Sequence, residues 1–308
     1  FCPKLLAELC TFALQLYVGL SCHKQLIIIY VLFLYKRLLE VCNVETTGSY
    51  ERIKYQNSPL KNVICQLRFP PILVIDSNDP SDFQDFLRKN DFPIYEKTIE
   101  YQHDFNIVAN NPSSNQVRME SNYNHEFYSL DKKWKVNLTK NFISLSTENY
   151  DTWDHFKTKL VSILDMFNTL YSPALYSRIG LRYIDIFERS AIGFDRNEKK
   201  WSELISPEFL GYYLNSDSKG KVKSFNLVNE LVCDDDVSLM RINSGTVINN
   251  ETSEECIQLD NDCYNEQNTN VNGVIDLLDI LHKNSRILLN EAITSELHTS
   301  MKPVILDE

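Results

Sequence analysis

RIGLRYIDIFE, residues 178–188, is the stretch that decides the fold class of this chain. Arg178 and Arg182 alternate with apolar residues, and a period of two is typical of a β-strand that buries one face. A similar stretch occurs earlier, because Leu67-Arg68-Phe69 matches residues 181–183 at an offset of 114. The chain is therefore expected to contain two related halves, each beginning with a strand of this kind.

The same offset relates residues further along the chain. It carries Ile143, Leu145 and Tyr150 onto Ile257, Leu259 and Tyr264. It also superimposes an apolar helical pattern, which consists of Leu160, Val161, Ile163, Leu164 and Phe167 in the first half and Val274, Ile275, Leu277, Leu278 and Leu281 in the second. The strands between these points align only with gaps. We predict an internal duplication, with pseudo-repeats at about residues 56–171 and 177–297.

Periodicity and turn residues give the order of the elements. Alternating stretches predict strands at 61–69, 94–108, 178–188, 223–233, 237–245 and 256–263, with two or three more within 126–147. Helical spacing predicts helices that begin near Pro80 and span 151–171, 198–214 and 272–297, the third of them divided at Pro207. Asp234-Asp235-Asp236 is expected to form a turn between strands.

This order predicts an α+β fold. A repeated strand–helix–strands–helix unit builds a curved antiparallel sheet with its long helices on one face, a topology similar to that of TATA-box-binding proteins or helix-grip folds. We expect residues 49–308 to form this single domain. A similar topology implies nothing about DNA binding, because unrelated functions share folds.

Residues 1–48 differ in character from the rest and form an apolar extension. The run LIIIYVLFLY has ten apolar residues, whereas a membrane span needs about 20. Lys36-Arg37 follows that run where a secretion signal would have small residues. The first methionine is Met119, and we expect residues 1–48 to lie outside the native folded protein. The alternative is a membrane-tethered form through residues 5–40.

Composition limits the function classes. The net charge is −11, which disfavours nucleic acid as a partner. The eight cysteines lack the spacing of a zinc site and fit a reducing cytoplasm, so we expect a cytoplasmic protein without a bound metal. Only eight glycines are present, which leaves little material for phosphate-binding loops. We therefore expect no cofactor, and a protein or peptide as the partner.

Two pairs of charged residues are the candidate sites. Asp260 and Asp262 share one face of a strand, about 7 Å apart, where a third oxygen ligand would complete a metal site. Arg178 and Arg182 also share a face and are suited to binding an anion, with Asp185 nearby. The simpler interpretation of the two arginines is an ion-pair ladder between strands. A metal-dependent hydrolase or nuclease using Asp260, Asp262 and Arg182 is the enzymatic alternative.

Several stretches resemble a sporadically distributed prokaryotic family of uncharacterised proteins. The resemblance covers about residues 56–294, and its marks are Pro59-Leu60, Tyr150 followed by Trp153, and the Arg178-x-Gly180-Leu181-Arg182-Tyr183 motif. Asp185 stands where we would expect Asn. The family provides no activity or catalytic residues to carry over, and its patchy occurrence implies mobile or defence-associated genes. We therefore expect a non-enzymatic binding module rather than an enzyme.

Overall fold

The computed structural model describes residues 52–105, 117–196, 198–215 and 222–306. The apolar extension at residues 1–48 lies outside this part of the chain. Within it, no helix is long and apolar enough to cross a membrane. Residues Ile53–Glu308 group into one unit, which is described below.

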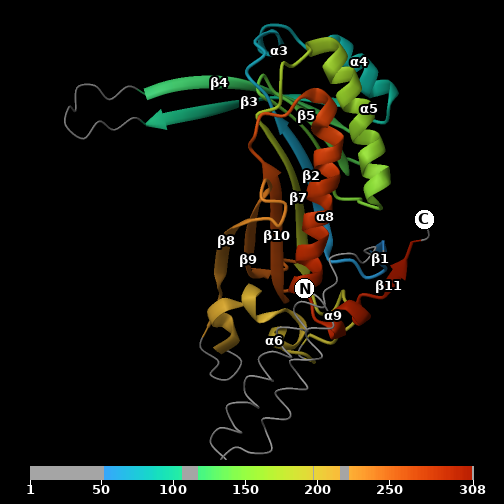
Figure 1. The fold of residues 1–308 in the computed structure, drawn as a ribbon, viewed down its shortest axis with the longest axis vertical. Helices are drawn as coiled ribbons and strands as arrows, with labels where there is room; N and C mark the ends of the chain where they lie inside the picture. Colours follow the sequence, from blue (N-terminus) through green and yellow to red (C-terminus); the bar gives the residue numbers. More distant parts are fainter. Residues whose placement is uncertain (1–51, 106–116, 197, 216–221, 307–308) are drawn as a thin grey trace, which may run out of the picture. The chain divides into compact units, whose positions relative to one another are not determined.

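A nine-stranded antiparallel sheet forms the centre of this unit (Figure 1). Its strand order is β3-β4-β5-β6-β2-β7-β10-β9-β8. The strands are β2 (Leu60–Arg68), β3 (Ile94–Phe105), β4 (Val117–Tyr128), β5 (Trp134–Leu138), β6 (Phe142–Thr147), β7 (Arg178–Phe187), β8 (Asn226–Val232), β9 (Leu239–Ile248) and β10 (Glu255–Asn265). The predicted α+β class with a large antiparallel sheet is confirmed.

The two strands that carry the matching sequence triplets lie side by side at the middle of the sheet. Cys65 of β2 pairs with Leu181 of β7, and both side chains are fully buried. On its other edge β7 pairs with β10, where Asp262 lies opposite Arg182. Since side chains alternate between the two faces of a strand, this register decides which charged residues meet.

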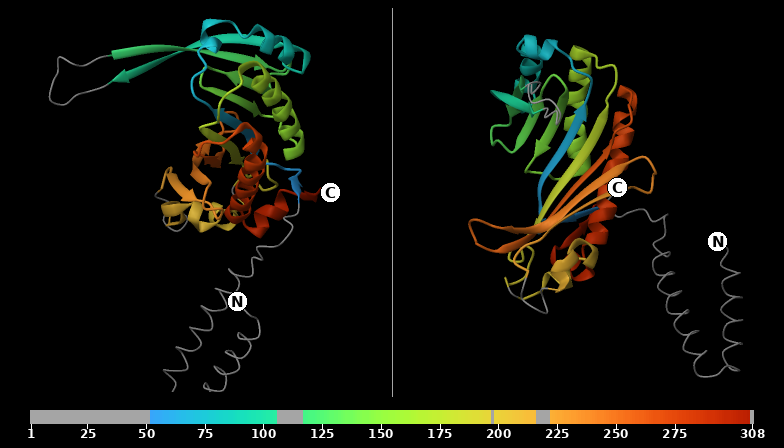
Figure 2. Two further views of the ribbon diagram at one scale, coloured as in Figure 1. Left: turned by 45° about the horizontal axis from the view of Figure 1, so that its top comes forward. Right: turned by 90° about the vertical axis from the view of Figure 1, so that its left-hand side faces the viewer.

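Two long helices cover one face of the sheet, α5 (Trp153–Tyr171) and α8 (Val274–Ala292) (Figures 1 and 2). The hydroxyl of Thr152 accepts a hydrogen bond from the amide of His155 and so caps the start of α5. Smaller helices are α3 (Val74–Ser77), α4 (Ser81–Lys89) and α9 (Ser295–Ser300). The core between helices and sheet includes the fully buried residues Leu67, Phe83, Phe127, Phe156, Phe167 and Leu278.

A polar cluster joins the two long helices. Trp153 of α5 donates from Nε1 to the Asp279 carboxylate of α8 at 2.7 Å, and Lys157 approaches the same carboxylate at 3.0 Å. The Trp153 ring stacks on His282 with centroids 4.7 Å apart, and His282 Nδ1 lies 2.7 Å from the Tyr183 hydroxyl. Burial lowers the pKa of His282 to about 3, so its ring is neutral at physiological pH.

Two predicted helices are divided, the first of them next to Pro207 as predicted, and one tertiary contact lies at both divisions. The segment at 198–214 forms only α6 (Trp201–Leu204) and the 3₁₀ turns η2 (Pro207–Phe209) and η3 (Gly211–Asn215). The helix predicted at 272–297 divides into η4 (Val271–Gly273), α8 and α9. Ile205 and Ile293 form an antiparallel bridge, which requires extended backbone at both residues. The pairing joins residues that are distant in the sequence, so the local apolar periodicity could not predict it.

A second, two-stranded sheet was not predicted. Its strands β1 (Ile53–Tyr55) and β11 (Pro303–Ile305) join the first and last segments of this unit. Each has three residues, which is too short for an alternation pattern to be recognised. The Tyr55 hydroxyl lies 2.8 Å from Nδ1 of His298 and connects the same two segments.

Candidate anion-binding site on the open sheet face

The candidate site lies on the sheet face opposite the two long helices. Alternate residues of β2, β7, β9 and β10 point to this face, which we call the open face because the helices of the described chain pack on the other one. A pocket of about 420 Å³ lies there. The residues that give it its chemical character are Gln66, Arg68, Arg178, Arg182, Arg241 and Asp262.

Arg182 occupies the middle of the open face. Its Nε and Nη2 donate to the two carboxylate oxygens of Asp260 at 2.6 and 2.5 Å, a bidentate pair between neighbouring strands. This hydrogen bond raises the pKa of Arg182, and the guanidinium stays charged. Asp260 is only 6% exposed and therefore depends on Arg182 for its charge balance.

Arg178, four residues before Arg182 on β7, forms a second ion pair. Its Nη2 donates to Asp262 at 2.9 Å, and its guanidinium lies over the Tyr264 ring, 4.4 Å from the centroid. Gly180 makes this placement possible, because a Cβ there would lie 2.5 Å from Nη1 of Arg178. The glycine in the Arg178-x-Gly180 motif thus gives the guanidinium room beside Asp262.

Replacing Gly180 with Ala is expected to displace the Arg178 guanidinium from its position between Asp262 and Tyr264. The backbone at this position needs no left-handed conformation, so the variant should fold and lose only about 1–2 kcal/mol of unfolding free energy. Urea titration measures the loss. Ser144 lies on β6 of the same face, and Ser144→Ala serves as a matched control; an equal effect of both changes would contradict the role given to Gly180.

The predicted carboxylate pair does not come together as a metal site. Asp260 and Asp262 do share the open face, as predicted, but each accepts a hydrogen bond from its own arginine. Within the described ranges, no group of three or more His, Cys, Asp or Glu residues is placed to hold a metal ion. The ion-pair ladder, which was the simpler interpretation of Arg178 and Arg182, is what the structure contains.

Asp185 does not belong to this site, although the sequence places it close to the arginines. It pairs with Leu259 of β10 and points to the helix-covered face, where it is 5% exposed. Burial raises the pKa of its carboxyl to about 7. Burial thus favours the protonated, uncharged form of Asp185 in the folded protein.

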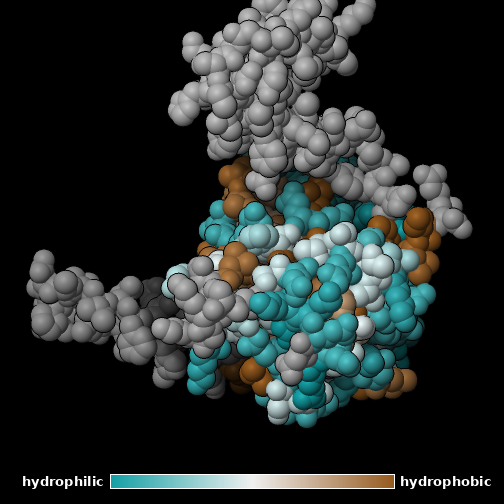
Figure 3. All heavy atoms as spheres, turned by 90° about the horizontal axis from the view of Figure 1, so that it is seen from below, coloured by the Kyte–Doolittle hydropathy of each residue, from teal (hydrophilic) through white to brown (hydrophobic). Residues whose placement is uncertain are grey.

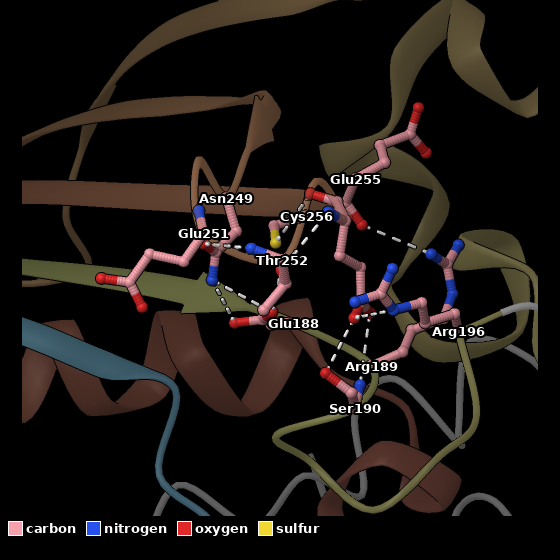
Figure 4. A network of polar contacts seen from close by, with 10 residues as sticks. Glu188, Arg189, Ser190, Arg196, Asn249, Glu251, Thr252, Glu255 and Cys256 are labelled. Carbon is pink, nitrogen blue, oxygen red and sulfur yellow. Dashed lines mark hydrogen bonds and ion pairs between the residues drawn. The ribbon is translucent and has the colours of Figure 1, made fainter.

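A further polar cluster lies at the end of β7 and has a structural role (Figure 4). Glu188 accepts hydrogen bonds from Asn249 Nδ2 at 2.9 Å and from Thr252 Oγ1 at 2.8 Å. Glu254 accepts one from Ser190 Oγ at 2.7 Å. These bonds join the segment after β7 to the turn between β9 and β10, and they satisfy two acidic residues that are each under 10% exposed.

Sequence reasoning missed two of the four arginines in the pocket. The sequence contained a signal for Arg68, because the offset of 114 residues aligns it with Arg182, which was a candidate. Arg241 had none, since its position depends on β9 pairing with β10 so that Arg241 lies opposite Asp262.

Neither a scan of protein-family models nor a search of curated proteins finds a match to this sequence. The function is therefore inferred from the geometry of the open face.

Proposed function

We propose that this protein is a non-enzymatic binding module that contacts a protein or peptide partner through the open sheet face. The observation that carries the proposal is the concentration of four arginines around one pocket in a chain whose net charge is −11. Arginine is enriched where proteins recognise partners, since its guanidinium forms directed hydrogen bonds with carboxylates. A cytoplasmic location belongs to the same proposal.

Exposed apolar residues give less support for a docking surface than the arginine pocket does. Hydrophilic residues cover most of the described surface visible in Figure 3, and hydrophobic residues occur there in several separate groups. Exposed apolar residues such as Leu73, Leu130 and Tyr212 lie apart from one another, and a small group, Val228, Leu231 and Val232, lies on the edge strand β8. Isolated exposed apolar residues are ordinary on protein surfaces. The arginine pocket is therefore the feature with the most specific chemistry.

We also propose that the sheet arose by duplication, with the two-repeat topology expected from the sequence. The strand order supports this, because β2 and β7 begin the two halves and lie together at the centre. In each half the last strand, β6 or β10, returns to pair with the first. The second half has β8, β9 and β10 where the first has β3, β4, β5 and β6.

Charge reversal at the pocket tests the binding function. Affinity-tagged full-length protein carrying Arg241→Glu is compared with wild type in extracts of the source cells. Arg88→Glu on α4 is the matched control, since Arg88 is half exposed and lies outside the pocket. We expect a defined set of proteins to co-purify with wild type and Arg88→Glu and to be lost with Arg241→Glu. Recovery of the same set with all three proteins would contradict the proposal.

A further inference from the structure

We infer that the outer edge of strand β8 pairs with β8 of a second copy of this chain, so that two sheets join into one. β8 is the last strand in the sheet order and lies at the margin of the sheet in Figure 1. On its inner side it pairs with β9, and no strand of the described ranges pairs with its outer side. Pairing at this edge needs no ligand in the arginine pocket, so the dimer is independent of the proposed function.

Apolar side chains of β8 are exposed on both faces of the strand. Four of its seven residues are apolar, and Val228, Leu231 and Val232 are each exposed by 47% or more. Since side chains alternate along a strand, Val228 and Val232 lie on one face and Leu231 on the other. Apolar side chains grouped on an unpaired strand are typical of a surface that a partner covers.

The opposite edge strand, β3, has features that prevent pairing with another chain. Glu96 forms an ion pair with Lys132 at 2.8 Å, and Lys97 forms one with Asp79 at 2.7 Å. Charged side chains on an edge, lysine above all, protect it from pairing, and proline does the same. β8 contains neither lysine nor proline. The two edges of the sheet therefore differ in whether they oppose the addition of a strand.

Every second residue of β8 directs its backbone N–H and C=O groups away from β9. The amide of Thr246 donates to the carbonyl of Phe225, just before β8, at 3.1 Å, and the amide of Cys233, just after β8, donates to that of Ser238 at 2.8 Å. The register between β8 and β9 has no bulge, and hydrogen-bonded pairs alternate along an antiparallel ladder, so the residues of odd number bond to β9. The backbone groups that point outward belong to Asn226, Val228, Glu230 and Val232.

The strand is complementary to itself, which favours a second copy over a foreign strand. The antiparallel register that pairs all seven residues centres on Asn229 and matches residues of even number with one another, as their outward backbone groups require. It places Leu227 opposite Leu231 of the second copy and Val228 opposite Glu230 of the second copy. Apolar residues therefore meet, and the two Glu230 carboxylates do not face each other, whereas like charges directly opposite destabilise a sheet.

The single charge of β8 is already engaged within its own subunit. Glu230 accepts a hydrogen bond from the hydroxyl of Tyr264 and lies opposite Arg241 on β9. The added strand therefore needs no positive charge to balance Glu230. Pairing in this register joins the sheets into one of eighteen strands, nine from each copy, with the open faces on the same side.

Sedimentation velocity of the full chain tests the dimer. The seven residues of β8 are fewer than the about 20–30 residues a side of a standard interface, so we expect a reversible dimer with a dissociation constant on the order of 10 µM. Concentrations roughly tenfold below and above that value cover the transition from monomer to dimer.

The sign of a charge at position 228 tests the register. Val228→Glu places a carboxylate opposite Glu230 of the second copy, and because this contact occurs twice in the symmetric dimer, association should weaken about tenfold or more. Val228→Lys places an ammonium there and should leave association within about threefold of wild type or strengthen it. Ile99→Glu on β3 is the matched control, since Ile99 is 47% exposed and Val228 48%, and it should change nothing. Urea titration confirms that each variant is folded.

Three results would overturn the dimer through β8. The first is a protein that stays monomeric over the whole concentration range. The second is an association that Val228→Glu leaves unchanged, which would assign it to another part of the chain. The third is equal weakening by Val228→Glu and Ile99→Glu, which would show a general effect of added charge. A loss with Val228→Lys as large as with Val228→Glu would overturn the register centred on Asn229.

Discussion

Replacing Asp185 with Asn is expected to stabilise the folded protein by up to about 4 kcal/mol at pH 8. Burial raises the pKa of Asp185 from 3.8 to about 7. Between these values the folded chain binds more protons than the unfolded chain, so this group reduces stability progressively as pH rises, and the loss is complete above pH 7. Asn has nearly the same shape as protonated Asp and cannot ionise, so the variant lacks this loss.

Urea unfolding at pH 5, 6, 7 and 8 checks the prediction. The difference in unfolding free energy between variant and wild type should grow with pH and level off above pH 7. His282, whose lowered pKa makes stability fall as pH decreases below about 6.5, acts equally on both proteins and cancels in the difference. A difference that is constant across this range would show that Asp185 has an ordinary pKa in the folded protein.

Replacing Arg182 with Ala is expected to destabilise the protein by about 3 kcal/mol, because it leaves the buried Asp260 carboxylate without its partner. The value is taken at the low end for a buried pair, since the Arg182 side chain is 43% exposed and water can partly solvate the site. Removing the charge of Asp260 as well should restore most of the loss, because no unpaired charge then remains.

A double-mutant cycle with Arg182→Ala, Asp260→Asn and the combined variant measures this coupling. Equilibrium urea unfolding gives the three differences in free energy. We expect Arg182→Ala alone to be less stable than the combined variant. If the combined variant loses the sum of the two single losses, the ion pair contributes no coupling and Asp260 must be stabilised by other groups.

The sequence predicted which charged residues share a face, because that depends only on alternation within a strand. It placed Arg178 with Arg182 and Asp260 with Asp262, and the structure has both pairs on the open face. It could not predict which arginine meets which carboxylate, since this depends on the register between β7 and β10. It also grouped Asp185 with the arginines, although a position of odd number on β7 points to the helices.

Tertiary contacts account for the errors in the helices. The apolar periodicity of residues 272–297 is real, and α8 uses it to bury Leu278, Leu281 and Leu288. The helix nevertheless ends at Ala292, because Ile293 bridges Ile205 from a distant segment. The local apolar pattern indicates which side chains of a helix are buried. It does not indicate which distant segment of the chain will end the helix.

Site-specific photocrosslinking tests the central claim, that the open sheet face is the binding surface. A benzophenone amino acid replaces Gln66 in the pocket or, as a control, Ile280, which is 42% exposed on α8. Full-length variants are irradiated in the source cells, and crosslinked proteins are identified by mass spectrometry. The account predicts specific crosslinks from position 66 that disappear when Arg241→Glu is added, and none of them from position 280. The same crosslinked proteins at both positions, or crosslinks from position 66 that survive Arg241→Glu, would contradict it.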